Sequence, residues 1–400
     1  MAGRRAFNRL DVPAACSLLR RAAALLTPDD PALPGLKVAL GMAFVEAGMV
    51  EEADAVLAEA AATTSDEGLV RLVAVERTTM QMRLHPDRIV LDQVTAEVEA
   101  SIPVFTRLSD DRGLTRSWRV LADVHWLRCH FADMAMASER ALEHARRTKD
   151  GWEEGLALAM LSTALDCAPT PVGEAIERCQ VLLAEAGKRR WESGMLGPLG
   201  HLEAMQGQFP VARELIGRGR AIAEEFRLTY PLPWLAWWSG KIELLAGDLV
   251  AAERELRLSY AMYEHMGEKD MLSTVAADLA GVLARKGHTS ESLRLTEESR
   301  VLAGREDVWS HTLWRSVQAT VLAQQGRTAE AERLARTAVE SAAQTDFLDL
   351  HAGVLLTLTE VLRSVGTDPP VRTLLEDAAL LYQQKGNLVS LARVETLLDH

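Results

Sequence analysis

The chain has 400 residues, of which 48% are hydrophobic and 25% are charged, and these proportions exclude a disordered or collagen-like protein. Lys and Arg number 44 against 57 Asp and Glu, which gives a net charge of −13. Because an acidic surface repels phosphate, we expect no direct nucleic-acid partner. The sequence has no apolar run of membrane-spanning length, no signal-peptide core and no cysteine framework. These absences predict a cytoplasmic protein without membrane contact.

Taken in order, nearly all of the chain reads as amphipathic helix interrupted by short turns, and strand-like alternation is absent. The turns recur about every forty residues, after one gap of about two periods that holds a poorly matching turn near Leu84–Asp87. Their centres are Gly48, Cys129, Thr170, Gly207, Gly247, Gly287, Gly326 and Gly366. We therefore predict an all-α chain of about ten helix-turn-helix units rather than the two or three domains that 400 residues usually form.

Small residues keep fixed distances from these turns. Seven residues before the turn stand Gly41, Ala122, Thr163, Gly200, Gly240, Ala280, Ala319 and Thr359. Small residues also dominate the positions five and twelve residues after each turn. Such columns indicate that the two helices of each unit cross closely and stack on the next unit.

These features resemble the tetratricopeptide repeat (TPR), here with units of about forty residues in place of the usual thirty-four or so. Leu40-Gly41, Leu121-Ala122, Leu199-Gly200 and Leu279-Ala280 match the Leu-Gly/Ala pair of that family. The resemblance implies a single right-handed superhelical solenoid over residues 1–400, with first helices lining a concave groove.

Both ends of the chain resemble the repeat arm of large bacterial regulators that carry a nucleotide-binding switch domain. The similar segments are AGRRAFNRLDVPAACSLLRRAAALLTPDD and LLEDAALLYQQKGNLVSLARVETLLDH. The regulators that they resemble include the maltose-regulon activator and cyclase-linked ATPases. The repeat template places Met1 inside a first helix, so residues 1–35 are expected to be a truncated repeat, or alternatively a shortened cap. Residues 385–400 are expected to be a closing helix. The resemblance implies an upstream ATPase or cyclase partner domain, whereas this chain has no Walker A motif.

Motifs for catalysis are absent, including HExxH, GxSxG and a strand-associated GxGxxG, so we assign no catalytic residue and no cofactor. His125, Cys129 and His130 lie near one another in sequence. A zinc site needs three or four ligands and no suitable second pair is nearby, so we predict turn and packing residues here and no metal. Cys167 and Cys179 lie across a turn and are expected to be free thiols.

The richest aromatic segment is Tyr230-Pro-Leu-Pro-Trp-Leu-Ala-Trp-Trp238, at the start of a first helix. Family alignment places Trp234, Trp237 and Lys241 on the groove-facing stripe, three and four residues apart, and turns Trp238 into the stack. The same mapping adds residues from preceding repeats, namely His201, Arg116, Arg119, Asp123 and Trp126.

Aromatic rings beside polar groups can hold a sugar, a peptide or a partner helix. They can equally fill the gaps between helix pairs. The leading hypothesis is a non-enzymatic interaction or sensor module that binds a peptide, a partner domain or a small effector in the groove. The alternatives are a helical-repeat enzyme with a groove active site and a purely architectural arm that relays an upstream nucleotide switch.

Overall fold

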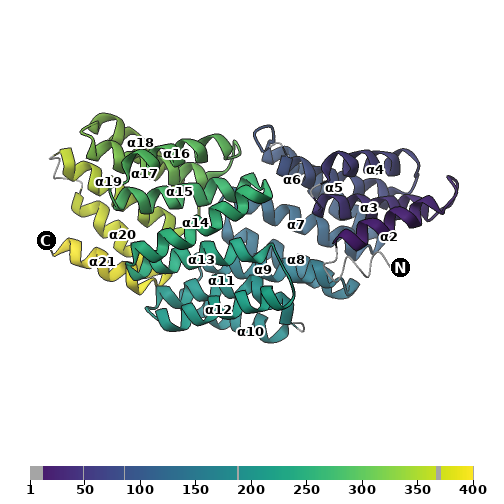
Figure 1. Ribbon diagram of the computed structural model, residues 1–400, viewed down its shortest axis with the longest axis horizontal. Coiled ribbons are helices and arrows are strands. Elements are labelled where there is room, and N and C mark those ends of the chain that lie inside the picture. The colour runs from purple at the N-terminus through teal and green to yellow at the C-terminus, as the bar shows by residue number, and fades with distance from the viewer. Residues whose placement is uncertain (1–11, 48, 85, 187–188, 366–370, 400) are drawn as a thin grey trace. The chain divides into compact units, whose positions relative to one another are not determined.

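The computed structural model describes residues 12–47, 49–84, 86–186, 189–365 and 371–399. In these ranges the chain forms twenty α-helices, named with the labels of Figure 1. They are α2 (Val12–Ala24), α3 (Leu33–Glu46), α4 (Val50–Ala62), α5 (Glu67–Leu84), α6 (Leu91–Leu108), α7 (Asp111–Leu127), α8 (Phe131–Thr148), α9 (Gly151–Cys167), α10 (Val172–Glu185), α11 (Arg189–Met205), α12 (Phe209–Glu225), α13 (Pro231–Ala246), α14 (Leu249–Met266), α15 (Lys269–Arg285), α16 (Thr289–Leu302), α17 (Val308–Gln324), α18 (Thr328–Ala342), α19 (Leu348–Val365), α20 (Val371–Lys385) and α21 (Leu388–Leu398).

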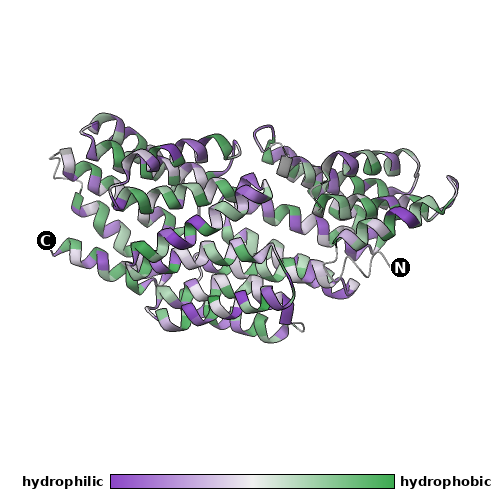
Figure 2. Ribbon diagram, viewed as in Figure 1, coloured by the Kyte–Doolittle hydropathy of each residue, from purple (hydrophilic) through white to green (hydrophobic). Residues whose placement is uncertain are grey.

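Consecutive helices pack pairwise as hairpins, from α3 with α4 to α19 with α20. Helix α2 precedes the first of these hairpins, and α21 follows the last one. The truncated first repeat predicted for residues 1–35 stays a prediction. Many helices carry both hydrophobic and hydrophilic residues (Figure 2), as they do when one face packs on a neighbour. The predicted all-α architecture of about ten repeats is therefore confirmed.

The predicted turns are confirmed wherever the structure describes them. Cys129, Gly207, Gly247, Gly287 and Gly326 all have φ between 53° and 83°, the left-handed conformation that ends many helices. A further turn around Thr170 separates α9 from α10. The predicted centres at residues 48 and 366, and the start of the first repeat in residues 1–11, lie outside the described residues.

The small-residue columns lie where the helices of each hairpin cross. A Cβ added to Gly240 would come within 2.6 Å of Leu256 Cγ, and one added to Gly41 would meet Leu57 Cγ at the same distance. All eight members of the column five residues after the turn are buried, as are all eight members of the column twelve residues after it. The close crossings inferred from the sequence are thus present.

The chain forms two compact units. Unit 1 comprises residues 1–124 with 136–157, and unit 2 comprises residues 125–135 with 158–400. Helices α7, α8 and α9 each contribute residues to both units. The single superhelix predicted for residues 1–400 stays a prediction.

Unit 2 contains contacts between segments that are far apart in the sequence. The Lys385 side chain is completely buried, and its Nζ donates hydrogen bonds to the carbonyl oxygens of Leu165, Ala168 and Thr170 at 3.3, 2.7 and 3.0 Å. These acceptors lie at the C-terminal end of α9, where unpaired carbonyls and the helix dipole favour a cation. The end of α20 is therefore tied to the end of α9.

Other contacts in unit 2 also join segments that are far apart in the sequence. Gln206 Nε2 donates to the carbonyl oxygen of Gly386 at 2.7 Å, and α21 packs beside α11 (Figure 1). At a second place, Asp346 accepts hydrogen bonds from the backbone amides of Phe131 and Ala132 at 2.7 and 2.8 Å. This carboxylate therefore caps the N-terminus of α8 from a residue more than two hundred positions away.

Two further properties concern the described residues alone. Their helices include none long and apolar enough to cross a membrane. All four cysteines are buried and free, as predicted for Cys167 and Cys179. Burial raises the pKa of Cys167 well above its ordinary value and that of Cys179 to about 12, so both are thiols rather than thiolates at neutral pH.

Candidate functional site

Seven aromatic rings gather in unit 2 and are here called the aromatic cluster. Helix α13 contributes three of them on one face, because residues three and four apart lie side by side on a helix. The other four come from the last turn of α7, from the first residue of α8, from α17 and from the residue before α19. The members are Trp126, Phe131, Trp234, Trp237, Trp238, Trp309 and Phe347, with neighbouring ring centroids 4.7–6.2 Å apart.

The rings differ in their exposure. Trp237 and Trp238 are completely buried and Trp309 nearly so, whereas Trp126 and Trp234 are half-buried. The two half-buried rings lie against each other at 6.2 Å. The cluster thus has a dry interior and a partly accessible edge formed by Trp126 and Trp234.

A cation lies over the interior rings. Lys241 Nζ is 5.3 Å from the Trp237 ring centroid and 5.4 Å from that of Trp309, the geometry of a cation–π contact. The Trp237 indole N–H donates to Asp278 at 2.6 Å. Burial raises the pKa of Asp278, and the positive charge of Lys241 and the Trp237 hydrogen bond oppose that rise.

His201 packs against Trp238, with the two ring centroids 5.0 Å apart. Its Nδ1 is 2.9 Å from Oδ1 of Asp166, and both side chains are almost fully buried. This pairing fixes the imidazole orientation and compensates its burial. The structure therefore brings together five of the residues singled out in the sequence, namely Trp126, Trp234, Trp237, Lys241 and His201.

The other three sequence candidates belong to unit 1. Arg116 lies 3.3 Å from Glu76 and 2.6 Å from Glu153, and Arg119 lies 3.8 Å from Glu153. All four side chains are at most 4% exposed, so these arginines form a buried ion cluster that joins α5, α7 and α9. Asp123 is half-buried. Their predicted role in binding a ligand stays a prediction.

Sequence reasoning did not find Trp309, Asp166 or Asp278. A signal for Asp278 was nevertheless present, because it lies 41 residues after Trp237, one repeat further along the chain. A comparison of equivalent positions in successive first helices would have picked it out. Asp166 and Trp309 have no such signal, since their contacts depend on how the repeats of unit 2 pack.

Comparisons with known proteins show the fold. No protein-family model matches the sequence, and no curated protein matches it. A Rap protein in complex with Competence and Sporulation Factor is similar, with a TM-score of 0.53, 12% identity and coverage of 92% of this chain and 96% of that chain.

Two further solved structures have TM-scores below 0.5. A STAND ATPase with a TPR sensor from Pyrococcus horikoshii gives a TM-score of 0.46 at 12% identity and covers 97% of this chain and 72% of that chain. Yeast Tom70 gives a TM-score of 0.36 at 12% identity, covering 98% of this chain and 93% of that chain. Together with the helical hairpins, the likeness to the Rap protein identifies a TPR-like helical-repeat protein.

Proposed function

We propose that this TPR-like chain is a non-enzymatic interaction module that binds a peptide at the edge of the aromatic cluster. TPR-like folds are typically used to bind proteins and peptides, and the similar Rap protein was solved with Competence and Sporulation Factor. The observation that carries the proposal is the pair of half-buried indoles, Trp126 and Trp234, beside Lys241. Partly exposed tryptophans on a rigid base are typical anchors at interfaces.

The arrangement suggests how such a peptide is held. An apolar side chain of the peptide packs on the accessible faces of Trp126 and Trp234, where it adds to an existing dry contact. A carboxylate of the peptide pairs with Lys241, whose charge is only partly screened because the residue is half-buried. Trp237, Trp238 and the His201–Asp166 pair support these groups from beneath.

The test begins with selection of peptides from a random library on the full chain. Their affinities are then measured by fluorescence anisotropy for the wild type, Trp234→Ala and Lys241→Met. Trp152→Ala is the matched control, because Trp152 is also a half-buried first-helix tryptophan but belongs to unit 1. We expect losses of at least about 2 kcal/mol for Trp234→Ala and no loss for the control. Equal affinity of all four proteins would refute the site.

A purely architectural arm is the second candidate, and the complete burial of Trp237 and Trp238 favours it. In that case Trp234→Ala lowers the melting temperature, and the library yields no peptide that depends on Trp234. Measuring both stability and affinity on the same variant therefore separates the two functions.

Attachment to a bacterial signal-transduction ATPase is also proposed, from the resemblance of the terminal segments. An upstream switch domain would then be the partner whose state the module reports. The mass of the endogenous protein tests this directly, and a mass equal to that of these 400 residues would contradict a covalently attached ATPase.

A further inference from the structure

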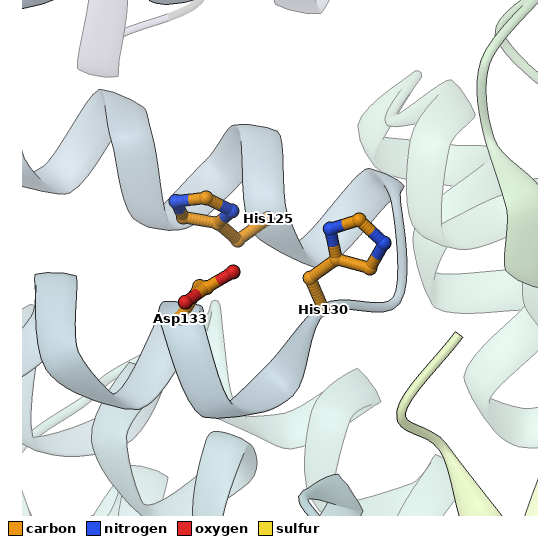
Figure 3. Close-up of side chains that lie close together, drawn as sticks. All are labelled: His125, His130 and Asp133. Carbon is orange, nitrogen blue, oxygen red and sulfur yellow. The ribbon is translucent and has the colours of Figure 1, made fainter. Parts of the chain in front are cut away.

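Three potential metal ligands meet at the turn between α7 and α8, all within unit 2. His125 lies in the last turn of α7, His130 directly precedes α8, and Asp133 lies in the first turn of α8. One nitrogen from each histidine and one oxygen of Asp133 lie within 4.8 Å of one another. Figure 3 shows the Asp133 carboxylate facing the His125 ring across the turn, with His130 at the turn itself.

The backbone of the turn holds these side chains together. Cys129 adopts a left-handed φ of 53°, and the His130 amide donates to the carbonyl oxygen of His125 at 2.9 Å. Asp346 then caps α8 through the amides of Phe131 and Ala132. The turn thereby brings His130 and Asp133, five and eight residues after His125, close to it in space. A continuous helix would not place these three positions on one face.

His125 is the member that most needs a partner. Its Nδ1 is buried and has no hydrogen-bond partner in the structure, and leaving a buried polar atom unpaired costs free energy. Burial lowers the pKa of His125, an effect that Arg128 and His130 add to and that Asp133 and Asp346 oppose. A metal ion bound to this nitrogen would supply the missing partner.

The donor set matches one class of ion. Imidazole nitrogen suits zinc, copper, nickel and iron, whereas calcium and magnesium prefer oxygen ligands alone. Metal–ligand bonds of about 2.0–2.2 Å in a tetrahedral site place the ligand atoms about 3.4 Å apart. The ligand atoms of this cluster lie within 4.8 Å of one another, so small side-chain rotations bring them to the distance that a metal ion needs. Asp133 is exposed and free to make that adjustment.

We propose that His125, His130 and Asp133 bind a divalent first-row transition ion, with Zn²⁺ as the favoured occupant. Three protein ligands leave at least one coordination position for water or for a donor from a partner. The sequence predicted no metal here because no suitable second pair of ligands lies near His125, Cys129 and His130. Cys129 is buried at the turn and does not belong to the cluster, while Asp133 takes the third position.

The test uses the full chain without a histidine tag, titrated with Co²⁺ and followed by its visible d–d absorption, then by displacement with Zn²⁺. Asp133→Asn and His130→Asn are the informative variants, and circular dichroism confirms that each is folded. His288→Asn is the control, because His288 is an exposed histidine at another hairpin turn. A change in melting temperature on adding Zn²⁺ gives a second readout.

We expect one equivalent of Co²⁺ to bind to the wild type and to the control, and Zn²⁺ to raise the melting temperature of both. The affinity should fall roughly tenfold or more in Asp133→Asn and His130→Asn, with no shift of the melting temperature. Absence of d–d bands in the wild type with excess Co²⁺ would overturn the proposal. So would unchanged binding in both variants, because the ion would then be held elsewhere.

Discussion

The buried ammonium of Lys385 provides the sharpest test of how unit 2 is held together. Replacing Lys385 with Met keeps the length and most of the volume of the side chain but removes the donor of three hydrogen bonds. The carbonyl oxygens of Leu165, Ala168 and Thr170 then lose a partner at 2.7–3.3 Å. Since Lys385 is 0% exposed, water cannot reach the site without local opening.

The expected cost follows from two opposing contributions. Hydrogen bonds from a charged donor contribute about 1.5–3 kcal/mol each, which gives a gross loss of several kcal/mol for three. Removal of the ammonium also relieves its desolvation, which costs several kcal/mol for a buried ion. Because the carbonyls remain buried and unpaired, we expect a net destabilisation of about 3 kcal/mol.

Hydrogen exchange measured by mass spectrometry is the appropriate assay, because repeat proteins open locally. Amides in the last turns of α9 and α20 should exchange about a hundredfold faster in Lys385→Met, since each 1.4 kcal/mol or so is a factor of ten. The control is Lys286→Met, which removes a half-buried lysine paired with Glu253 at 2.5 Å and should cost about 0–1 kcal/mol. Equal protection of these amides against exchange in the two variants would show that Lys385 does not hold the ends of α9 and α20 together.

Three further changes probe other parts of the structure. Gly240→Ala places a Cβ against Leu256 and should lower the free energy of unfolding in urea by about 1–3 kcal/mol. The control Gly217→Ala, with open space around the new Cβ, should raise it by about 0.5–1 kcal/mol. A stability change of the same sign in both variants would contradict the close helix crossing at Gly240. Glu153→Gln removes the buried carboxylate that Arg116 and Arg119 share and should cost about 3–5 kcal/mol in the same assay. A surface-like effect below about 1 kcal/mol would disprove this. Burial in the folded state raises the pKa of Cys179 from 9.0 to about 12. The contribution of this thiol to the free energy of unfolding is therefore complete below pH 9 and falls as the pH rises from 9 to 12. Cys179→Ala should flatten this alkaline decline in stability, and an unchanged pH profile would count against the assignment.

The repeats could be predicted because they rest on local information. A glycine or other turn residue every forty positions and a small residue seven positions earlier are both visible in one sequence, and each reports a contact within one hairpin. The left-handed turns at Gly247 and Gly287 and the close approach at Gly240 followed directly. Turns between successive hairpins were harder to predict from the sequence, because Ser109 and Arg227 adopt a left-handed φ there although neither is glycine.

The candidate site could be predicted only in part. Trp234, Trp237 and Lys241 share one helix, so their common face follows from helical spacing. Their contacts with Trp126 and Trp309 depend on packing between repeats, which the sequence pattern does not report. The buried position of Arg116 was also missed, although its partner Glu76 lies in the preceding first helix, α5, one repeat earlier.

The hydrogen bonds between Lys385 and the end of α9 can form only late in the synthesis of the chain. Most hairpins can form as soon as their own residues leave the ribosome, but Thr170 must wait for a partner that is 215 residues further along. At about 5–20 residues per second, translation alone imposes a delay of about 10–40 s. During that interval the carbonyl groups at the end of α9 lack the ammonium that caps them in the folded protein.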